Sequence, residues 1–296
     1  MLAPQFQKFA NSYDQATPIQ SEVALSLAQQ IRAFANDGHQ QEVWADIGCG
    51  TGKLSQAVLQ QVLQENNMSR GMLNTPFVRH NGYWAYAIRP YLATLIGVDN
   101  SQNMLDIWQN NCQNLVKNLT PCMGVLHTPL SDNHLRSPNF VPMLTNMQNL
   151  PFADNAVDVV MSSFALHWAT PKVILELGRV VKKGGYLYLA IPVAGSFRQV
   201  SERFPQLPIY PFLPSQDWQL AIEQLIQQRQ GKVQFFDERS FHHTYPNLKT
   251  LLAELKQMGG AVSGQSAMSP SVLRQYLNNP LPIDLDYQIL MVGVAL

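Results

Sequence analysis

A glycine-rich turn between a strand and a helix limits the fold more than any other feature of this sequence. The segment DIGCGTG follows the apolar run EVWA and precedes a helical pattern, and its candidate ligand-binding residues are Asp46, Gly48, Cys49, Gly50 and Gly52. Glycines at such a junction let the backbone turn tightly and bring its N–H groups against a ligand. The loop therefore predicts an open α/β sheet with a ligand at this junction, and a glycine turn without a ligand is the alternative.

The acidic residues near this turn favour one class of ligand. The spacing D-x-G-x-G-x-G differs from the G-x-G-x-x-G of dinucleotide folds, and a carboxylate at Asp46 would repel a phosphate but suits the cationic amino end of a methionine. Asp99, at the tip of the run TLIGVD, can accept hydrogen bonds from both hydroxyls of a ribose. We therefore expect S-adenosylmethionine, with S-adenosylhomocysteine as its product, rather than NAD.

The residues after Asp99 extend this candidate site. Asn100 and Met104 are further cofactor-binding candidates, with Met104 near the adenine. Asp99 could instead cap the following helix, although Asn100 or Ser101 could also do so. The chain from Thr94 to Asp99 would then be a strand whose tip carries the ribose acceptor.

Strands that alternate with helices predict a doubly wound, mostly parallel, seven-stranded sheet of the Rossmann-like type. The expected strands are 42–48, 94–99, 142–146, 156–164, 185–193, 232–245 and 286–296. The expected helices are 18–36, 53–64, 101–118, 171–182, 215–229, 246–260 and 270–279. We expect the last strand to pair with 232–244 at the sheet edge.

The domain organisation follows from these elements. We expect a single domain over 1–296 that begins with a helical lid segment at 1–36. A cofactor-binding core follows at 43–193, with insertions at about 66–92 and 118–140. The remaining sheet edge spans 194–296 and contains a helical, substrate-side insertion at 246–280. Both insertions in the core are rich in Asn, Pro, Gly and His and show little periodicity, as surface loops do.

Composition narrows the partners and the compartment. The chain has 20 basic and 20 acidic residues, so it has no overall field that would attract nucleic acid or an anionic membrane. Three cysteines in no CxxC pair argue against a disulfide framework and a structural zinc site. Without a signal-like start or a long apolar run, we expect a cytoplasmic monomer with no metal.

Two further segments follow the third and fourth strands. Asn146 and Met147 open the segment NMQNLPF, and Ser163 and His167 lie in SSFALHW, at the strand ends where ligands usually meet an open α/β sheet. His167 could be a base, a substrate donor or a helix cap, and a purely structural or surface histidine is the alternative.

Longer stretches resemble known families. DIGCGTG, GVDNSQNML and ELGRVVKKGGYLYL resemble class I S-adenosylmethionine-dependent methyltransferases over about 43–193. The chain also resembles the biotin-pathway malonyl-acyl carrier protein O-methyltransferase (BioC) family in six short segments. In chain order they are FANSYDQAT, SSFALHW, PVAGSF, FLP, LKQMGGAVSGQ and DYQILMVGVA. Ser163 and His167 replace the Asn and Gln of that family's S-N-L-A-x-Q-W segment, and Asn146 stands where an acidic residue commonly accepts a bond from the adenine.

The resemblance implies methyl transfer to the free carboxylate of a malonyl group on acyl carrier protein. It places Tyr13 over the reacting methyl group, with the N-terminal segment as a lid, although a tyrosine that packs a helix is equally compatible. Arg198 and Arg203 are candidates to bind the substrate carboxylate, with surface residues as the alternative. An ionised carboxylate needs no general base, which agrees with the lack of a convincing catalytic triad or metal cluster.

Charged residues elsewhere have smaller expected roles. Arg179 is assigned to a structural ion pair, and Lys182, Lys183, Lys249 and Lys256 are candidates for a basic rim that meets acidic carrier protein. Two other functions stay open: a carboxyl methyltransferase for a free small acid, similar to the trans-aconitate enzyme, and a cofactor-binding interaction protein without activity.

Overall fold

The computed structural model describes six parts of the chain, residues 17–34, 43–61, 92–119, 138–257, 269–278 and 280–296. Tyr13, Cys122 and most of both predicted core insertions lie outside these residues. Within them, no helix is both long and apolar enough to cross a membrane.

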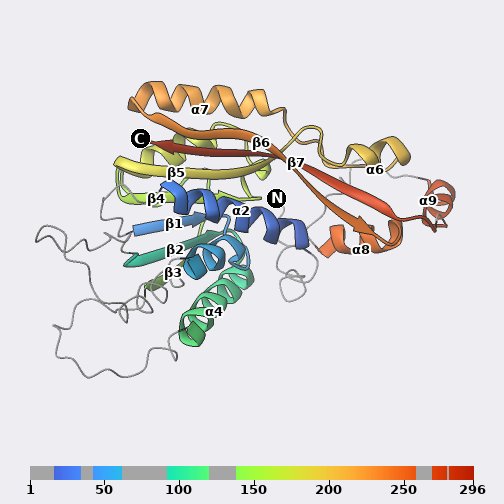
Figure 1. Ribbon diagram of the computed structural model, residues 1–296, viewed down its shortest axis with the longest axis horizontal. Coiled ribbons are helices and arrows are strands. Elements are labelled where there is room, and N and C mark those ends of the chain that lie inside the picture. Colours follow the sequence, from blue (N-terminus) through green and yellow to red (C-terminus); the bar gives the residue numbers. More distant parts are fainter. Residues whose placement is uncertain (1–16, 35–42, 62–91, 120–137, 258–268, 279) are drawn as a thin grey trace, which may run out of the picture.

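Seven strands form one sheet in the order β3-β2-β1-β4-β5-β7-β6 (Figure 1). Their bounds are β1 Val43–Ile47, β2 Thr94–Asp99, β3 Asn139–Leu144, β4 Val157–Ser163, β5 Val181–Val193, β6 Lys232–Tyr245 and β7 Ile283–Ala295. β1 to β5 are parallel, and β7 runs antiparallel to both β5 and β6. The predicted doubly wound, mostly parallel sheet of seven strands is confirmed.

Helices cover both faces of the sheet because the strands carry apolar side chains on both sides. In β1, Trp44 belongs to one buried cluster, and Ala45 and Ile47 belong to the other. The first cluster includes side chains of α2 (Pro18–Phe34), the helix at 53–61 and α4 (Gln102–Leu119). The second includes side chains of η3 (Leu166–Trp168), α5 (Val173–Val180) and α7 (Ser215–Arg229).

The described part of the predicted N-terminal lid is built into the core. Ile19, Val23, Leu27 and Ile31 follow helical spacing in α2, and all four are buried against the sheet. Because this face is fully covered, α2 is a packed layer of the domain rather than a lid. The remaining residues of the predicted lid, 1–16, lie outside the described residues.

Several strands and helices begin or end at other residues than predicted, because pairing with the neighbouring strand sets their ends. β3 begins at Asn139 instead of 142 because it pairs with β2 from Thr94 onward. α5 ends at Val180 and β5 begins at Val181, earlier than predicted, because Val181 pairs with Val157 at the start of β4. The last strand pairs with β6 as predicted, and it lies between β5 and β6, so β6 forms the edge.

β6 and β7 extend beyond the rest of the sheet. Val193, the last residue of β5, pairs with Gln288, and the earlier residues of β7 pair only with β6. Around this extension lie α6 (Arg198–Arg203), α8 (Leu248–Gln257) and α9 (Pro270–Leu277), as Figure 1 shows. Since β7 is antiparallel to β5, the extension projects from the carboxyl edge of the parallel strands, the edge that carries the glycine turn.

Candidate active site

The glycine turn has the backbone conformation that its sequence predicts. Gly48, Gly50 and Gly52 have φ angles of 67°, 50° and 94°, a region that side chains with a Cβ rarely adopt. The N–H groups of Gly48 and Cys49 both donate to the carbonyl of Val98, at 2.7 and 3.0 Å. The turn is therefore tied to the end of the neighbouring strand β2.

The three glycines differ in the space around them. A Cβ on Gly48 would lie 2.1 Å from the Cβ of Ala165, and one on Gly52 would lie 2.8 Å from the indole of Trp108. A Cβ on Gly50 would meet nothing within 4 Å. The turn is packed at both ends and open in its middle, where a ligand can approach the backbone.

Asp46 ends a buried chain of hydrogen bonds. Trp108 Nε1 donates to Ser55 Oγ at 2.9 Å, and Ser55 Oγ donates to Asp46 Oδ2 at 2.6 Å. Burial raises the pKa of Asp46 to about 7, although the bonds from Ser55 oppose this shift. Burial thus favours the protonated form, and a cationic ligand nearby would favour the charged carboxylate.

Asp99 joins the glycine turn to α4. Its carboxylate accepts a hydrogen bond from the N–H of Gly50 at 3.0 Å and another from the N–H of Ser101 at 2.9 Å. Burial raises the pKa of Asp99, and these backbone bonds counteract the shift. Ser101 rather than Asp99 caps α4, because its Oγ accepts the N–H of Met104 at 3.4 Å, whereas Asp99 bonds to the N–H of Ser101 before the helix begins. The Asp99 carboxylate also lies directly beside the open Gly50.

The other predicted cofactor residues lie around this position with different exposures. Asn100 is exposed, and Met104 is buried at the start of α4. Asn146 is exposed, and its side-chain oxygen accepts a bond from the N–H of Gln148 at 2.9 Å. Met147 is half-buried and lies near Gly48, since a Cβ on that glycine would be 3.7 Å from its methyl carbon.

Ser163, the last residue of β4, and His167, in η3, lie on the other side of the glycine turn. Ser163 Oγ and His167 Nδ1 are buried and have no hydrogen-bond partner among the described residues. Desolvation lowers the pKa of His167 to about 3, so the imidazole is neutral. A neutral ring with a pKa this low is a poor general base at neutral pH.

The arginines predicted to bind the substrate lie farther along the carboxyl edge. Arg198 is exposed at the first position of α6. Arg203 donates to the carbonyl of Pro282 at 2.7 Å, and its guanidinium lies 5.4 Å from the centre of the Phe204 ring. Arg203 therefore braces α6 against the start of β7.

Arg179 forms the structural ion pair that was predicted. It donates from Nε and Nη2 to both oxygens of Glu176 at 2.8 Å, and it pairs with Asp154 at 2.7 Å. Glu176 in turn accepts a bond from the N–H of Leu150 at 2.7 Å. This network fixes the loop before β4 to α5.

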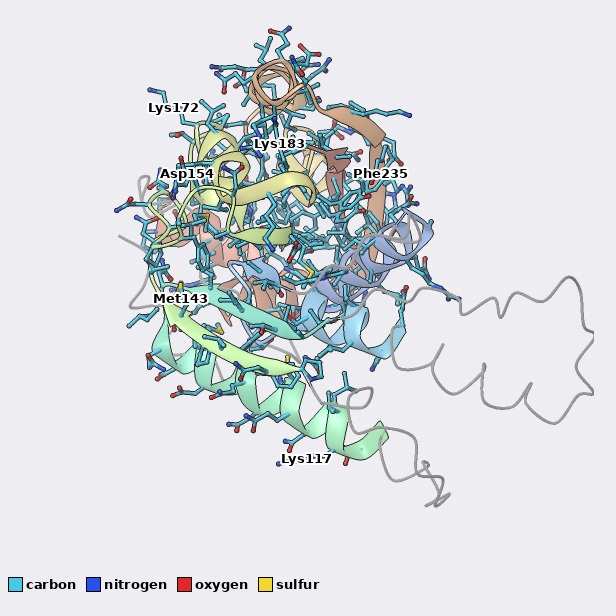
Figure 2. All side chains as sticks on the ribbon, turned by 90° about the vertical axis from the view of Figure 1, so that its left-hand side faces the viewer. Lys117, Met143, Asp154, Lys172, Lys183 and Phe235 are labelled. Carbon is cyan, nitrogen blue, oxygen red and sulfur yellow. The ribbon has the colours of Figure 1, made fainter. Side chains whose placement is uncertain are left out.

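Two lysines of the predicted basic rim lie at the opposite edge of the sheet. Lys182 pairs with Asp158 at 2.9 Å near the start of β5, and Lys183 follows it. Figure 2 looks onto this amino edge, where it labels Lys183. Lys182 and Lys183 therefore cannot belong to a basic rim at the carboxyl edge, because they lie at the start of β5, at the amino edge. Lys249 and Lys256 are exposed on α8, at the carboxyl edge.

Sequence reasoning missed the residues that support the site from a distance. The sequence did not predict that Ser55 and Trp108 form the hydrogen-bond chain to Asp46. It also did not predict the aromatic packing of His167, whose ring centre lies 5.7 Å from that of Tyr210 and 5.4 Å from that of Phe212. The only available signal was a polar Ser55 on the buried side of a helical pattern, which requires a partner.

The described residues fit a sulfonium nucleoside on structural grounds. Gly50 is open to a ligand, Asp99 offers a carboxylate beside it, and Asp46 is a buried acid that a cationic ligand would favour in its charged form. Cys49 is a buried free thiol whose pKa is raised by desolvation, so it does not act as a nucleophile. In the part of the chain described here, no three His, Cys, Asp or Glu side chains gather as a metal site requires.

Comparison with known sequences gives the family context. A family model described as a methyltransferase domain matches residues 80–189. A malonyl-[acyl-carrier protein] O-methyltransferase of Alcanivorax borkumensis is 33% identical over 141 residues, which cover 44% of this chain and 45% of the relative. A protein of the same name from Herminiimonas arsenicoxydans is 26% identical over 274 residues, covering 92% and 82%. The chain thus spans less than half the length of the Alcanivorax relative.

Comparison with solved structures supports the fold. The YcgJ protein of Bacillus subtilis superposes with a TM-score of 0.51 at 15% identity, covering 91% of this chain and 97% of that protein. Together with the sheet order and the glycine turn already described, these similarities show the class I methyltransferase fold, with a methyltransferase-domain match at residues 80–189.

Proposed function

We propose that the protein methylates the free carboxylate of malonyl-acyl carrier protein, at the start of biotin synthesis. The observation that carries the proposal is the alignment with the Herminiimonas relative, which spans 92% of the chain. This alignment extends well past the matched methyltransferase domain at residues 80–189 and into the acceptor side of the molecule. A relationship restricted to cofactor binding would not require similarity there.

The chain's own residues have defined roles in this proposal. Asp99 and the N–H of Gly50 hold the nucleoside end of the cofactor, and Asp46 favours its positive charge. Met104 and Asn146 flank the adenine, and Asn100 and Met147 complete the cofactor contacts. When bound, S-adenosylmethionine supplies a methyl group on a positively charged sulfur.

The acceptor needs orientation more than activation. A carboxylic acid with a pKa of about 4 is already ionised at neutral pH, so no side chain has to remove a proton. The neutral His167 is consistent with this requirement, because it could not serve as a strong base. We assign the rate enhancement to alignment of the carboxylate oxygen and to exclusion of water by the aromatic residues around it.

A direct assay tests the proposal. Purified protein is supplied with radiolabelled S-adenosylmethionine and, in parallel, malonyl-acyl carrier protein, malonyl-coenzyme A and trans-aconitate. We expect base-labile methyl ester to form fastest on malonyl-acyl carrier protein, and expression of the gene to restore growth of a biotin-requiring strain that lacks this methyltransferase.

Other outcomes have definite meanings. Preferred methylation of trans-aconitate would replace the proposed function by that of a small-acid methyltransferase. Tight binding of S-adenosylhomocysteine, without turnover of any of the three acceptors, would support a non-catalytic interaction protein. The variant Asp99→Ala serves as the matched negative control, because it removes the ribose acceptor.

A further inference from the structure

Several buried side-chain atoms have no hydrogen-bond partner within the described chain, and two of them lie close together in sequence beside the glycine turn. Ser163 Oγ and His167 Nδ1 have no partner among the described residues, although both atoms are shielded from solvent. A buried polar group left without a partner is destabilising, because it loses its hydration and gains no bond in return. Two such atoms, four residues apart at the end of β4, indicate a position where a ligand supplies the missing bonds.

These atoms lie beside the glycine turn, on the side away from Asp99. β1 has β2 as one neighbour and β4 as the other, so the ends of those two strands flank the turn from opposite sides. Ala165, between the two unsatisfied residues, packs directly against Gly48. Asp99 marks the nucleoside side, which leaves the side of Ser163 and His167 for the other reactant.

The ring of His167 is packed by aromatic residues from its own segment and from the segment that follows α6. Its ring lies 5.7 Å from Tyr210 and 5.4 Å from Phe212, which follow β5, and 4.5 Å from Trp168. Tyr210 also donates its hydroxyl to the His167 carbonyl at 2.7 Å. These aromatic groups hold the ring in place and present no opposite charge to it, which explains why the imidazole stays neutral.

We propose that Ser163 Oγ and His167 Nδ1 bind the carboxylate of the methyl acceptor as two uncharged hydrogen-bond donors. The inference rests on the proposed carboxyl methylation and deepens it by assigning the acceptor's binding groups. His167 acts in the tautomer that carries its proton on Nδ1, and each donor faces one carboxylate oxygen. Ser163 is thereby moved from the cofactor residues to the acceptor residues, and His167 positions the acceptor without moving a proton.

Uncharged donors suit this reaction better than an arginine. A guanidinium beside the acceptor would repel the positively charged methyl donor and would compete with it for the carboxylate. Two neutral donors orient the oxygens and leave the negative charge to attract the sulfonium. A buried carboxylate is thus compensated by the positive charge of the cofactor rather than by the protein.

Substitutions at the two positions test the assignment through substrate binding. We expect His167→Leu and Ser163→Ala each to raise KM for malonyl-acyl carrier protein by about tenfold, as the loss of a hydrogen bond to a charged group predicts. His167→Gln keeps a neutral donor and should recover most of this loss. His242→Leu, at an exposed histidine of β6, is the matched control and should leave KM unchanged.

A binding measurement distinguishes the acceptor from the cofactor. S-adenosylhomocysteine should bind all of these variants within about twofold of the wild-type affinity, because no cofactor contact is removed. Equal losses of cofactor and acceptor affinity would overturn the assignment, and so would an unchanged KM in both His167→Leu and Ser163→Ala.

Nuclear magnetic resonance gives a readout that does not depend on turnover. Histidine side-chain nitrogens are labelled, and malonyl-N-acetylcysteamine or its methyl ester is added with S-adenosylhomocysteine present. We expect the free carboxylate to shift the Nδ1 resonance of His167 and the methyl ester to leave it unchanged. A shift of equal size with both compounds would contradict the inference. If the wild-type protein methylates no malonyl thioester, the proposed function is contradicted, and this measurement still decides whether His167 binds a carboxylate.

Discussion

Two halves of the domain are built by different means, and we name them after the reactants proposed for them: the cofactor half contains β1 to β4, and the acceptor half contains the extension of β6 and β7. β1 to β4 are short parallel strands of five to seven residues, and their ends carry glycines and backbone N–H groups tied to Asp99. β6 and β7 are antiparallel strands of 14 and 13 residues, and their extension carries helices and aromatic side chains. Backbone conformation defines the first half, and side-chain packing defines the second.

In the proposed function, this difference separates the two reactants. A ligand held by backbone groups needs a fixed turn, which Gly48 and Gly52 provide through close packing. A ligand held by side chains depends on how those side chains pack against one another. Changes in the cofactor half should therefore alter cofactor affinity and stability, and changes in the acceptor half should alter substrate affinity.

The largest expected effect concerns the buried charge of Asp46 in the ligand-free protein. Its pKa is raised by burial to about 7, so between pH 4 and pH 7 the folded protein holds a proton that the unfolded chain has released. The free energy of unfolding should therefore fall by up to about 4 kcal/mol from this group as pH rises through that window. Asp46→Asn should remove this dependence and be more stable than wild type at pH 8.

Urea unfolding at pH 5, 6.5 and 8 measures this effect, with the exposed Asp106→Asn of α4 as the control. Binding of S-adenosylmethionine near pH 6.5 should also release protons from wild type and not from Asp46→Asn, which calorimetry in two buffers detects. Parallel pH profiles of the variant and the wild type would refute the buried-charge explanation.

The second effect concerns the packed end of the glycine turn. Gly48→Ala forces a Cβ against Ala165 at a positive φ, and we expect a loss of about 3 kcal/mol from overpacking and backbone strain combined. Adding Ala165→Gly should recover only the overpacking part. Gly50→Ala has a positive φ but open space, so its loss should be limited to about 1 kcal/mol. Equal destabilisation by Gly48→Ala and Gly50→Ala, measured by denaturant unfolding, would be inconsistent with the packing described here.

A third prediction tests the ribose assignment. Asp99→Ala should weaken binding of S-adenosylhomocysteine by at least about 1.5 kcal/mol, because charge-assisted hydrogen bonds are lost. Calorimetric titration measures the change, and the exposed Asp106→Ala is the control. An unchanged affinity would show that Asp99 serves only the Gly50 and Ser101 bonds seen in the structure.

The smallest effect should come from the basic rim. Reversing the charges of Lys249 and Lys256 should weaken the interaction with acidic carrier protein by about 1 kcal/mol in total, and less at high salt. KM for malonyl-acyl carrier protein should rise several-fold, and KM for malonyl-coenzyme A should stay within twofold. Lys183→Glu at the amino edge is the matched control. A similar change from Lys183→Glu would mean that carrier protein does not approach the carboxyl edge.

Local patterns predicted the cofactor half well. Strand, acid and glycines coincide in a short segment, so the turn at 46–52 and the strand ending in Asp99 could be placed from the sequence alone. The Arg179 network was also accessible, because Glu176 lies three residues earlier on the same helix. In each case the partners are close in sequence, or one element defines the geometry.

Contacts between distant segments could not be predicted. Asp46 depends on Trp108, and His167 depends on Tyr210, 43 residues later, and no periodicity links these positions. The extended boundaries of β3 and β5 have the same origin, because they are set by the neighbouring strand rather than by the residues themselves. Sequence patterns show which residues are buried, and tertiary structure decides what they meet.

The position of β7 has a consequence for synthesis on the ribosome. β6 is at the sheet edge, its strand partner is β7, and β7 is translated after it. A nascent chain that has completed β6 therefore presents a long unpaired strand, including the apolar Val233 and Phe236, until β7 emerges and inserts beside β5. Chaperone dependence should be greatest in that interval, and slower translation of the residues between β6 and β7 should increase aggregation.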